Sequence, residues 1–257
     1  MKLEEHVRQI KNDGLTFIPN AFSGKECEDI KSKLDNIIDN FTKKKILGAN
    51  KNSQIIYNPF RHDIDLIKLI FHKKVDKILK QVLDEDYVLI QCSTVNRKVS
   101  PHLTLRPTKD PGTDWHTDTR YLGNKKISPG FTYLVIAMFD DFRDDNSATM
   151  YVPKSHLLSN IPKRQGKYKY KSLLGKKGTI VIMDTGIVHK SGEASLRDRW
   201  SMFSIYGGWF VKPYYRFWDM FTKKEIMKFD KTYKKLLHFN SIPPKHEEER
   251  LSTLTKL

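Results

Sequence analysis

The 257-residue sequence is poor in cysteine and has no long hydrophobic run. Its two cysteines, Cys27 and Cys92, are too few for a disulfide framework or a cysteine-based zinc site. No apolar stretch approaches the roughly 18 residues of a membrane-spanning helix. The first residues are polar and acidic, without the basic start and apolar run of a secretory signal, so we expect a cytoplasmic protein. The sequence also lacks internal repeats and a glycine-rich phosphate loop, which removes repeat proteins and P-loop nucleotide sites from consideration.

Acidic residues are scarce relative to basic ones. The chain has 46 Lys and Arg against 30 Asp and Glu, a net charge of +16, and most of the excess is lysine. Residues 154–183 contain no Asp or Glu, but they include Lys154, Lys163, Arg164, Lys167, Lys169, Lys171, Lys176 and Lys177. Two interpretations stay open: a solvated lysine-rich surface, or a patch that meets an anionic ligand.

Hydrophobic periodicity divides the chain into a helical, a β-rich and a second helical part. A short strand at 15–19 and a loop at 41–60 interrupt the first part. We predict helices at 1–13, after the capping-box sequence at 23–26, at 63–83 and at 222–237. Runs rich in β-branched and aromatic residues lie at 87–95, 131–139, 149–152, 179–183 and 200–210.

Several short strands separated by turn signals favour a β-sandwich or barrel over alternating βαβ units. The apolar fraction of 39% and the aromatic fraction of 11% are sufficient for a hydrophobic core. We therefore expect a mainly β protein with flanking helices, forming one domain over residues 1–257. This domain would have a helical N-terminal region at 1–86, a β core at 87–211 and a basic helical C-terminal extension at 212–257.

A possible metal-binding pair lies near the middle of the chain, in Asp114-Trp115-His116-Thr117-Asp118. In an extended strand, residues two apart point to the same face, so His116 and Asp118 would project an imidazole and a carboxylate side by side. One further histidine would complete the two-His-one-carboxylate set typical of non-haem Fe(II) oxygenases. The pair alone is weak evidence, because His-x-Asp also occurs by chance.

His189 is the best-placed third ligand among the other eight histidines, because it follows the apolar run 179–183 through a short turn. Ten residues later, Arg199 opens the next predicted strand. Its planar guanidinium can hold a carboxylate through two hydrogen bonds, and the hydroxyl of Ser201 shares its face. Arg197 is the rival anchor.

These motifs together resemble the Fe(II)/2-oxoglutarate oxygenases, and the surrounding sequence resembles the phytanoyl-CoA dioxygenase family within them. The segment 12–20, Asn-Asp-Gly-Leu-Thr-Phe-Ile-Pro-Asn, is similar to the opening of that family. The segment 144–156 is similar to its Asn-Gly-x-Leu-x-x-x-Pro-Gly-Ser-His motif, with Ser147 and Lys154 in place of the usual glycines. The resemblance covers roughly residues 8–210.

The resemblance implies a double-stranded β-helix, a cupin-like jelly roll, as the core. It implies that His116, Asp118 and His189 hold Fe(II) and that Arg199 anchors the cosubstrate 2-oxoglutarate, with Ser201 and Lys98 as further contacts. O2 is then the oxidant, with ascorbate as a supporting reductant. We interpret His156 as a loop-ordering residue. Three aromatic residues are interpreted as packing residues: Trp115, Tyr121 and Trp200.

Halogenating relatives lack the carboxylate that Asp118 provides, so the resemblance implies a dioxygenase that hydroxylates, desaturates or closes a ring on a small molecule. The basic segment 154–177 suggests an anionic substrate. Two alternatives remain. One is an AlkB-type nucleic-acid demethylase, although Phe203 and Ile205 stand where that type carries a second arginine six residues after the anchor. The other is a non-catalytic jelly roll that binds a ligand or partner.

Overall fold

The computed structural model describes residues 1–44, 53–99, 114–119, 121–127, 131–192, 196–241 and 246–248. Its N-terminal elements are α1 (Leu3–Asp13), β1 (Leu15–Ile18), α2 (Gly24–Lys44), β2 (Ser53–Tyr57), η1 (Pro59–Arg61), η2 (Ile64–Ile70) and α3 (Lys73–Val82). The β-rich part contains β3 (Val88–Arg97), β4 (Tyr121–Leu122), β5 (Lys125–Lys126), β6 (Thr132–Met138), β7 (Met150–Tyr151), η4 (Ser155–Leu157), β8 (Lys171–Ser172), β9 (Ile180–Asp184), β10 (His189–Lys190) and β11 (Arg199–Gly207). The C-terminal elements are η5 (Phe217–Asp219), α4 (Lys223–Ile226) and α5 (Lys231–Leu236).

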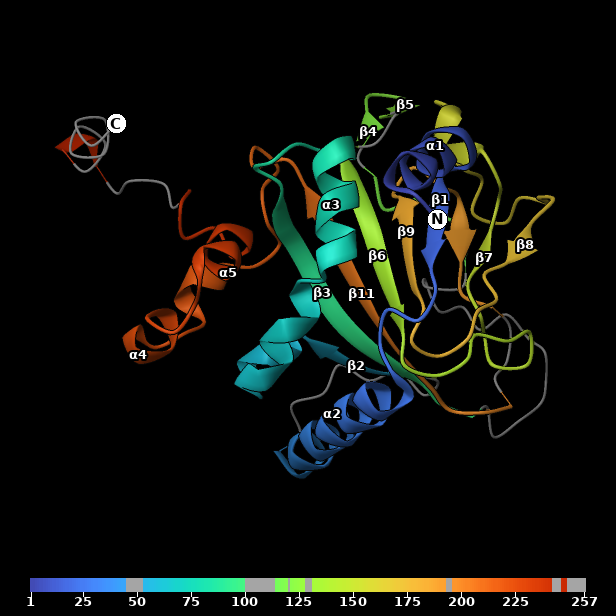
Figure 1. The fold of residues 1–257 in the computed structure, drawn as a ribbon. Helices are drawn as coiled ribbons and strands as arrows, with labels where there is room; N and C mark the ends of the chain where they lie inside the picture. Colours follow the sequence, from blue (N-terminus) through green and yellow to red (C-terminus); the bar gives the residue numbers. More distant parts are fainter. Residues whose placement is uncertain are drawn as a thin grey trace.

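Two antiparallel sheets form the core of the molecule (Figure 1). The larger sheet has the strand order β1-β9-β6-β11-β3-β2, and the smaller has the order β10-β7-β8. His116 adds an antiparallel bridge to the free side of β10. This arrangement confirms the predicted mainly β class with a jelly-roll core.

The two faces of the larger sheet pack against different partners. On β11, the side chains of Trp200, Met202 and Tyr206 join the core that lies under the helices. The alternate residues Phe203 and Ile205 pack with the cluster enclosed between the sheets. The period of two along a strand therefore separates an outer, helix-covered face from an inner face that lines the jelly roll.

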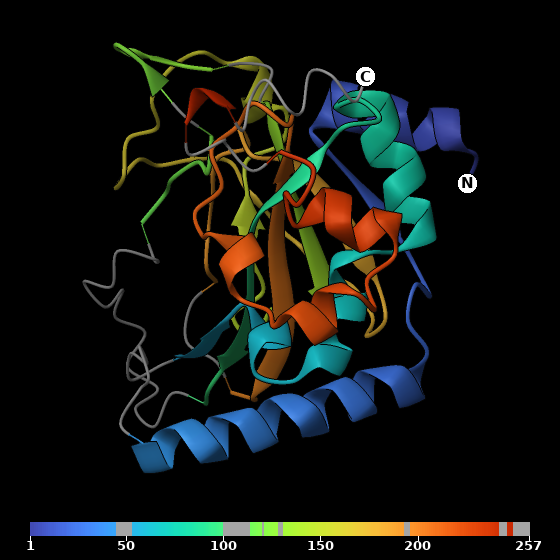
Figure 2. The same ribbon diagram turned by 90° about the vertical axis from the view of Figure 1, so that its left-hand side faces the viewer.

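Helices α1, α2, α3 and α5, together with η5, share one hydrophobic core with the outer face of the larger sheet. Figure 2 shows α2 running along one end of the sheet, with α3, α4 and α5 on the same side. The predicted capping box is present at the start of α2: Ser23 Oγ accepts from the Glu26 N–H at 3.2 Å, and Glu26 Oε2 accepts from the Ser23 N–H at 2.7 Å. Among the described helices, none is both long and apolar enough to cross a membrane.

The prediction of a loop over residues 41–60 was wrong at both ends of that range, while residues 45–52 lie outside the described residues. Helix α2 continues to Lys44, and β2 pairs with β3 in the register Ser53↔Arg97 to Tyr57↔Ser93. A five-residue edge strand has too few residues for a clear hydrophobic period. Its conformation is fixed by hydrogen bonds to β3, a partner more than thirty residues away in the sequence.

Two of the predicted long helices are each divided in the structure. The region 63–83 consists of η2 and α3, separated by Phe71 and His72 in extended conformation, and the His72 imidazole accepts from the Lys74 N–H. The region 222–237 consists of α4 and α5, with Asp230 as the N-cap of the second. In both places the apolar spacing continues across a local cap, so periodicity alone did not reveal the break.

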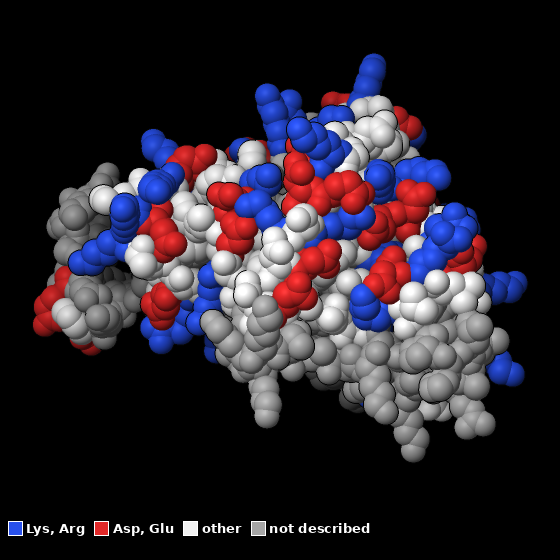
Figure 3. Space-filling view, turned by 90° about the horizontal axis from the view of Figure 1, so that it is seen from below, with Lys and Arg blue, Asp and Glu red and all other residues white. Residues whose placement is uncertain are grey.

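On one face of the molecule, the charged side chains of the described residues do not form a uniform positive surface. Seen from below the view of Figure 1, basic and acidic side chains are interleaved (Figure 3). Lys31 pairs with Glu28 and Asp140, and Lys33 pairs with Asp63 and Asp65. Helix α2 is thus joined to its neighbours by ion pairs as well as by the core.

Gly178 offers a test of the contact between the start of α2 and the sheet. Its φ is +82°, its carbonyl accepts from Ala21 and Phe22, and a Cβ there would lie 2.1 Å from Phe22 O. We expect Gly178→Ala to lower the free energy of unfolding by about 2–4 kcal/mol, since backbone strain and overlap with a backbone oxygen add. Urea denaturation measures the change.

Gly123→Ala is the matched control, because φ is +57° there and no atom lies within 4 Å of the added Cβ. It carries only the conformational cost of about 1–2 kcal/mol. Equal losses in the two variants would show that the close approach at Phe22 contributes nothing.

Candidate metal centre

His116, Asp118 and His189 come together between the two sheets although 73 positions separate the histidines in the sequence. Their ligand atoms all lie within 4.8 Å of one another. Nε2 of His189 is 3.5 Å from Asp118 Oδ2, and Nε2 of His116 is 3.9 Å from Asp118 Oδ1. In the described part of the chain, this is the one group of three or more His, Cys, Asp or Glu residues with a metal-binding arrangement.

Backbone hydrogen bonds hold the three residues in place. His116 and His189 exchange both main-chain bonds, at 3.0 and 2.9 Å, as a directly opposed antiparallel pair. The N–H groups of Asp118 and Thr119 both donate to Thr185 O at 3.0 Å. The turn after β9 therefore supports the carboxylate, while β10 supports both imidazoles.

Each imidazole is oriented by a carbonyl close to it in the sequence. Nδ1 of His116 lies 2.8 Å from Asp114 O, and Nδ1 of His189 lies 3.0 Å from Ile187 O. A carbonyl can only accept, so Nδ1 carries the proton and donates in each ring. This leaves the lone pair of Nε2 directed at the carboxylate, the orientation usual for metal-ligating histidines.

The electrostatics also favour a cation at this place. Burial lowers the pKa of His189, His116 adds to the lowering, and the Asp118 carboxylate opposes it. A metal ligand must be the neutral imidazole, so this pKa direction favours the binding form. Two imidazole nitrogens and one carboxylate oxygen fit Fe(II) and leave coordination positions open.

Arg199 begins β11 and is 2% exposed. Its Nε donates to Asn146 O at 2.9 Å and its Nη2 to Ser147 O at 3.0 Å, while the guanidinium lies 3.7 Å from the centroid of the Phe142 ring. Its buried Nη1 has no hydrogen-bond partner among the described residues. Burial, and secondarily Arg97, lower the pKa of Arg199 to about 9. A buried guanidinium with an unused N–H is costly unless an anion is present, so these groups fit a carboxylate ligand.

The other predicted contacts have different surroundings. Ser201 is fully buried on the same face as Arg199, and its hydroxyl donates weakly to Val95 O at 3.4 Å. Arg197, the rival anchor, has a side chain that is 66% exposed and pairs with Asp145 at 3.4 Å. Of the two arginines, Arg199 is the one enclosed in the fold.

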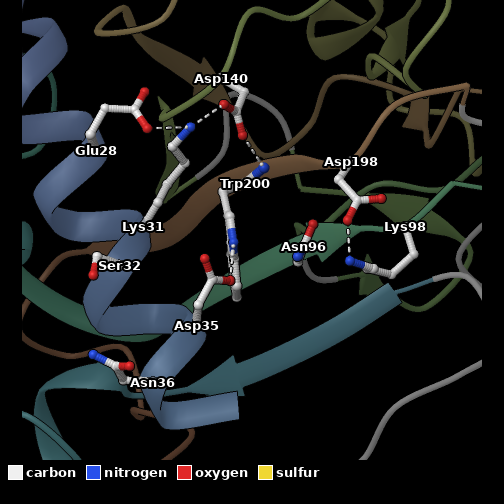
Figure 4. Close-up of a pocket in the computed structure, with 10 residues that line it drawn as sticks. All are labelled: Glu28, Lys31, Ser32, Asp35, Asn36, Asn96, Lys98, Asp140, Asp198 and Trp200. Carbon is white, nitrogen blue, oxygen red and sulfur yellow. Dashed lines mark hydrogen bonds and ion pairs between the residues drawn. The ribbon is translucent and has the colours of Figure 1, made fainter. Parts of the chain in front are cut away.

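Lys98 directly follows β3 and lies on the opposite face of the larger sheet from Arg199. Its ammonium pairs with Asp198 in a pocket between α2 and the outer face of the sheet (Figure 4). Arg97 instead stands opposite Arg199 in the strand register and donates to the hydroxyl of Ser191, two residues after His189. Sequence reasoning missed Arg97 by one position, because both faces of β3 are largely buried and its hydrophobic pattern does not reveal which residues face inward.

Of the residues interpreted as packing or ordering groups, the two tryptophans and His156 are buried and have such contacts, whereas Tyr121 is exposed. Trp115 is 6% exposed, and Trp200 donates through its indole N–H to Asp35 at 2.9 Å. The hydroxyl of Tyr121, which is 40% exposed, lies 2.7 Å from that of Thr117. Nε2 of His156 lies 3.1 Å from Lys11 O, which ties the segment after β7 to α1.

Solved structures with a similar fold include one with 2-oxoglutarate bound and one of an α-ketoglutarate-dependent enzyme. HygX from Streptomyces hygroscopicus, solved with nickel, 2-oxoglutarate and hygromycin B, matches with a TM-score of 0.63 at 12% identity, over 82% of this chain and 89% of that one. SnoK, a non-haem α-ketoglutarate-dependent carbocyclase from nogalamycin biosynthesis, matches with a TM-score of 0.61 at 16% identity, over 81% and 86%. At these identities the likeness shows the fold. The curated proteins include no match to this chain.

Fold, metal-binding geometry and relatives together define an enzyme of the iron(II)- and 2-oxoglutarate-dependent oxygenases. Within that class, the chain belongs to the phytanoyl-CoA dioxygenase (PhyH) family, whose sequence model matches residues 10–199. The cofactors of this enzyme are accordingly iron and 2-oxoglutarate. The predicted family and cofactors are confirmed, while the residue assignments stay predictions.

Arg199 and Arg197 form a matched pair for the cosubstrate anchor. We expect Arg199→Ala to weaken 2-oxoglutarate binding about 10- to 100-fold, because a charge-assisted bond in a buried site contributes about 1.5–3 kcal/mol. Arg197→Ala should leave the affinity within about twofold, since exposed ion pairs contribute little. Titration of the metal-loaded protein with 2-oxoglutarate measures both affinities, and a larger loss in Arg197→Ala would move the anchor to that residue.

Proposed function

We propose that this protein is a dioxygenase that oxidises an aliphatic C–H bond of a small anionic metabolite, with release of succinate and CO2. The proposal assigns iron binding to His116, Asp118 and His189 and the distal carboxylate of 2-oxoglutarate to Arg199. One observation carries it: the same jelly roll holds three converging metal-ligand atoms and a buried guanidinium with an N–H that has no hydrogen-bond partner among the described residues.

Bound iron supplies the activation of O2, coupled to decarboxylation of 2-oxoglutarate. The protein residues orient and enclose. Asp114 O and Ile187 O hold the two imidazoles with Nε2 forward, and His189 is 7% exposed. Arg199 fixes one end of the cosubstrate while its own position is held by Asn146 O and Ser147 O. Such fixed donors need no rearrangement when a carboxylate binds.

Asp118 bears on the type of oxidation. Asp118 would hold the iron together with His116 and His189, and the iron would supply the activation of O2 with 2-oxoglutarate. With this carboxylate present, the ligand set would not have the place that halogenating relatives free for a halide. We therefore favour hydroxylation, or a related desaturation or ring closure.

Arg97 supports the anionic character of the substrate. Its half-buried guanidinium is a second positive group on the inner face, opposite Arg199 in the register and bonded to Ser191. One dicarboxylate can neutralise both arginines, or 2-oxoglutarate can take Arg199 and the substrate anion Arg97. The proposal assigns no ligand to Lys98, because its ammonium is paired with Asp198 on the other face.

The two alternatives receive less support. A demethylase of the AlkB type would need a second arginine where this chain has Phe203, packed against the inner core, and Ile205, which is 5% exposed within it. A binding module without turnover would have no need for a complete ligand set with both histidines presenting Nε2.

Anaerobic titration with Fe(II) and 2-oxoglutarate tests the assignment of the metal ligands. We expect a visible charge-transfer band in the wild-type protein and its loss in His116→Ala. The reason is that 2-oxoglutarate gives this band only when it chelates the iron. His156→Ala is the control, since that imidazole bonds to Lys11 O and is not part of the proposed iron-binding triad of His116, Asp118 and His189. A wild-type protein that holds iron but gives no band would favour the binding module.

The variants Arg97→Ala and Lys98→Ala test which face of the sheet at the end of β3 takes part in binding. We expect Arg97→Ala to raise the Kd of 2-oxoglutarate or the KM of an anionic substrate about 10-fold or more, because it removes a partly buried charge from the inner face. Lys98→Ala should change both by less than about twofold. Succinate release, assayed across a panel of carboxylated and phosphorylated metabolites, gives the two KM values; the reverse ranking would restore Lys98 to the site.

A further inference from the structure

The basic segment 154–177 has a role that its charge does not reveal. Both its ends are attached to the protein near the metal centre. Lys126 N–H donates to Ser159 O at 2.7 Å on one side, and β8 pairs with β7, the neighbour of β10, on the other. The part between them reaches the strand segment that carries His116, where Trp115 N–H donates to Arg164 O at 3.0 Å.

Trp115 is the point of contact. Its ring centroid lies 5.3 Å from that of Tyr168 and 5.7 Å from that of Tyr170, and the Lys190 ammonium lies 5.0 Å from it. Trp115 and Lys190 directly precede and follow the ligands His116 and His189. Since neighbouring side chains in extended backbone point to opposite faces, this aromatic cluster lies behind the two imidazoles.

Tyr168 is itself held in a closed turn. Its hydroxyl accepts from Lys163 N–H at 2.8 Å, and Gly166 N–H donates to Lys163 O at 2.9 Å. A Cβ at Gly166 would lie 2.6 Å from the Tyr168 ring, so the glycine makes room for the ring. The turn is therefore shaped around the tyrosine that packs on Trp115.

We propose that Trp115 is a positioning residue of the metal centre, held by Tyr168, Tyr170 and Lys190, and that segment 154–177 serves this site chiefly through these two tyrosines. This inference rests on the proposed function of the triad. The His116 imidazole is fixed by a hydrogen bond to Asp114 O and by the main-chain pair with His189. Trp115 stands between Asp114 and His116 in the chain, so displacement of its ring shifts both the ligand and the carbonyl that orients it.

The test compares Co(II) binding and the visible spectrum of bound Co(II) among variants, with thermal unfolding measured in parallel. Trp115→Leu should weaken Co(II) binding about 10- to 100-fold, the range for residues that orient metal ligands, and should shift the spectrum. Trp115→Phe keeps an aromatic ring between the tyrosines and should restore most of the affinity. Gly166→Ala leaves Trp115 intact and should act in the same direction by displacing Tyr168.

Two controls separate positioning from charge and from loss of a tryptophan in general. The triple variant Lys167→Gln, Lys169→Gln, Lys171→Gln should keep the Co(II) affinity and spectrum of the wild type. Trp209→Leu, at a side chain that is 63% exposed, should do the same. A triple variant that loses affinity as strongly as Trp115→Leu would overturn the proposal in favour of a charge effect.

Trp115→Leu protein that stays folded and binds Co(II) as the wild type does, with an unchanged spectrum, would reduce Trp115 to a core residue. The nitrogen chemical shifts of His116 in metal-free protein give a second readout, because they report the Nδ1–H bond to Asp114 O. If wild-type protein binds no Co(II), the proposed function fails. A His116 shift that still changes in Trp115→Leu and Gly166→Ala would then support the positioning contact, and an unchanged shift would reject it.

Discussion

The main-chain pair between His116 and His189 is the constraint on which the site depends. Two hydrogen bonds at 3.0 and 2.9 Å fix the distance and the relative direction of two residues that lie far apart in the sequence. His189 belongs to β10 of the smaller sheet, which has the strand order β10-β7-β8. The positions of the metal ligands therefore depend on the register in which β10 pairs with its neighbours. A slip of one residue in β10 would turn His189 away from the carboxylate and Lys190 toward it.

The larger sheet provides the second fixed element. Its inner face changes along β11 from apolar positions at Phe203 and Ile205 to the buried, polar Ser201 and Arg199. The apolar end packs as a core, and the polar end leaves a guanidinium N–H with no partner in the described part of the chain. A protein interior rarely tolerates such a group unless a ligand completes it, so the same strand contributes to stability at one end and to recognition at the other.

The net charge of the chain says little about the binding site. The excess of lysine and the acid-free segment 154–183 left two interpretations open, a solvated surface and an anion-binding patch. On the one face drawn in Figure 3, acidic side chains stand between the basic ones. Among the described residues, Arg97 and Arg199 stand opposite each other on the inner face of the larger sheet, and the sequence argument found one of them. A net charge reports on the whole surface, whereas recognition depends on the few charges that the fold encloses.

The sequence by itself determined the local chemistry: the alternation that puts His116 and Asp118 on one face, the strand-turn setting of His189 and the capping box of α2. Each of these three features depends on residues close together in the chain. The jelly roll was predicted from the family resemblance. Only the tertiary structure decided that residues 53–57 are a strand, that Arg97 rather than Lys98 faces inward, and that Trp115 contacts two tyrosines of a distant segment. These features depend on strand pairing and packing between distant parts of the chain, and a hydrophobic pattern carries no information on which partner a strand will meet.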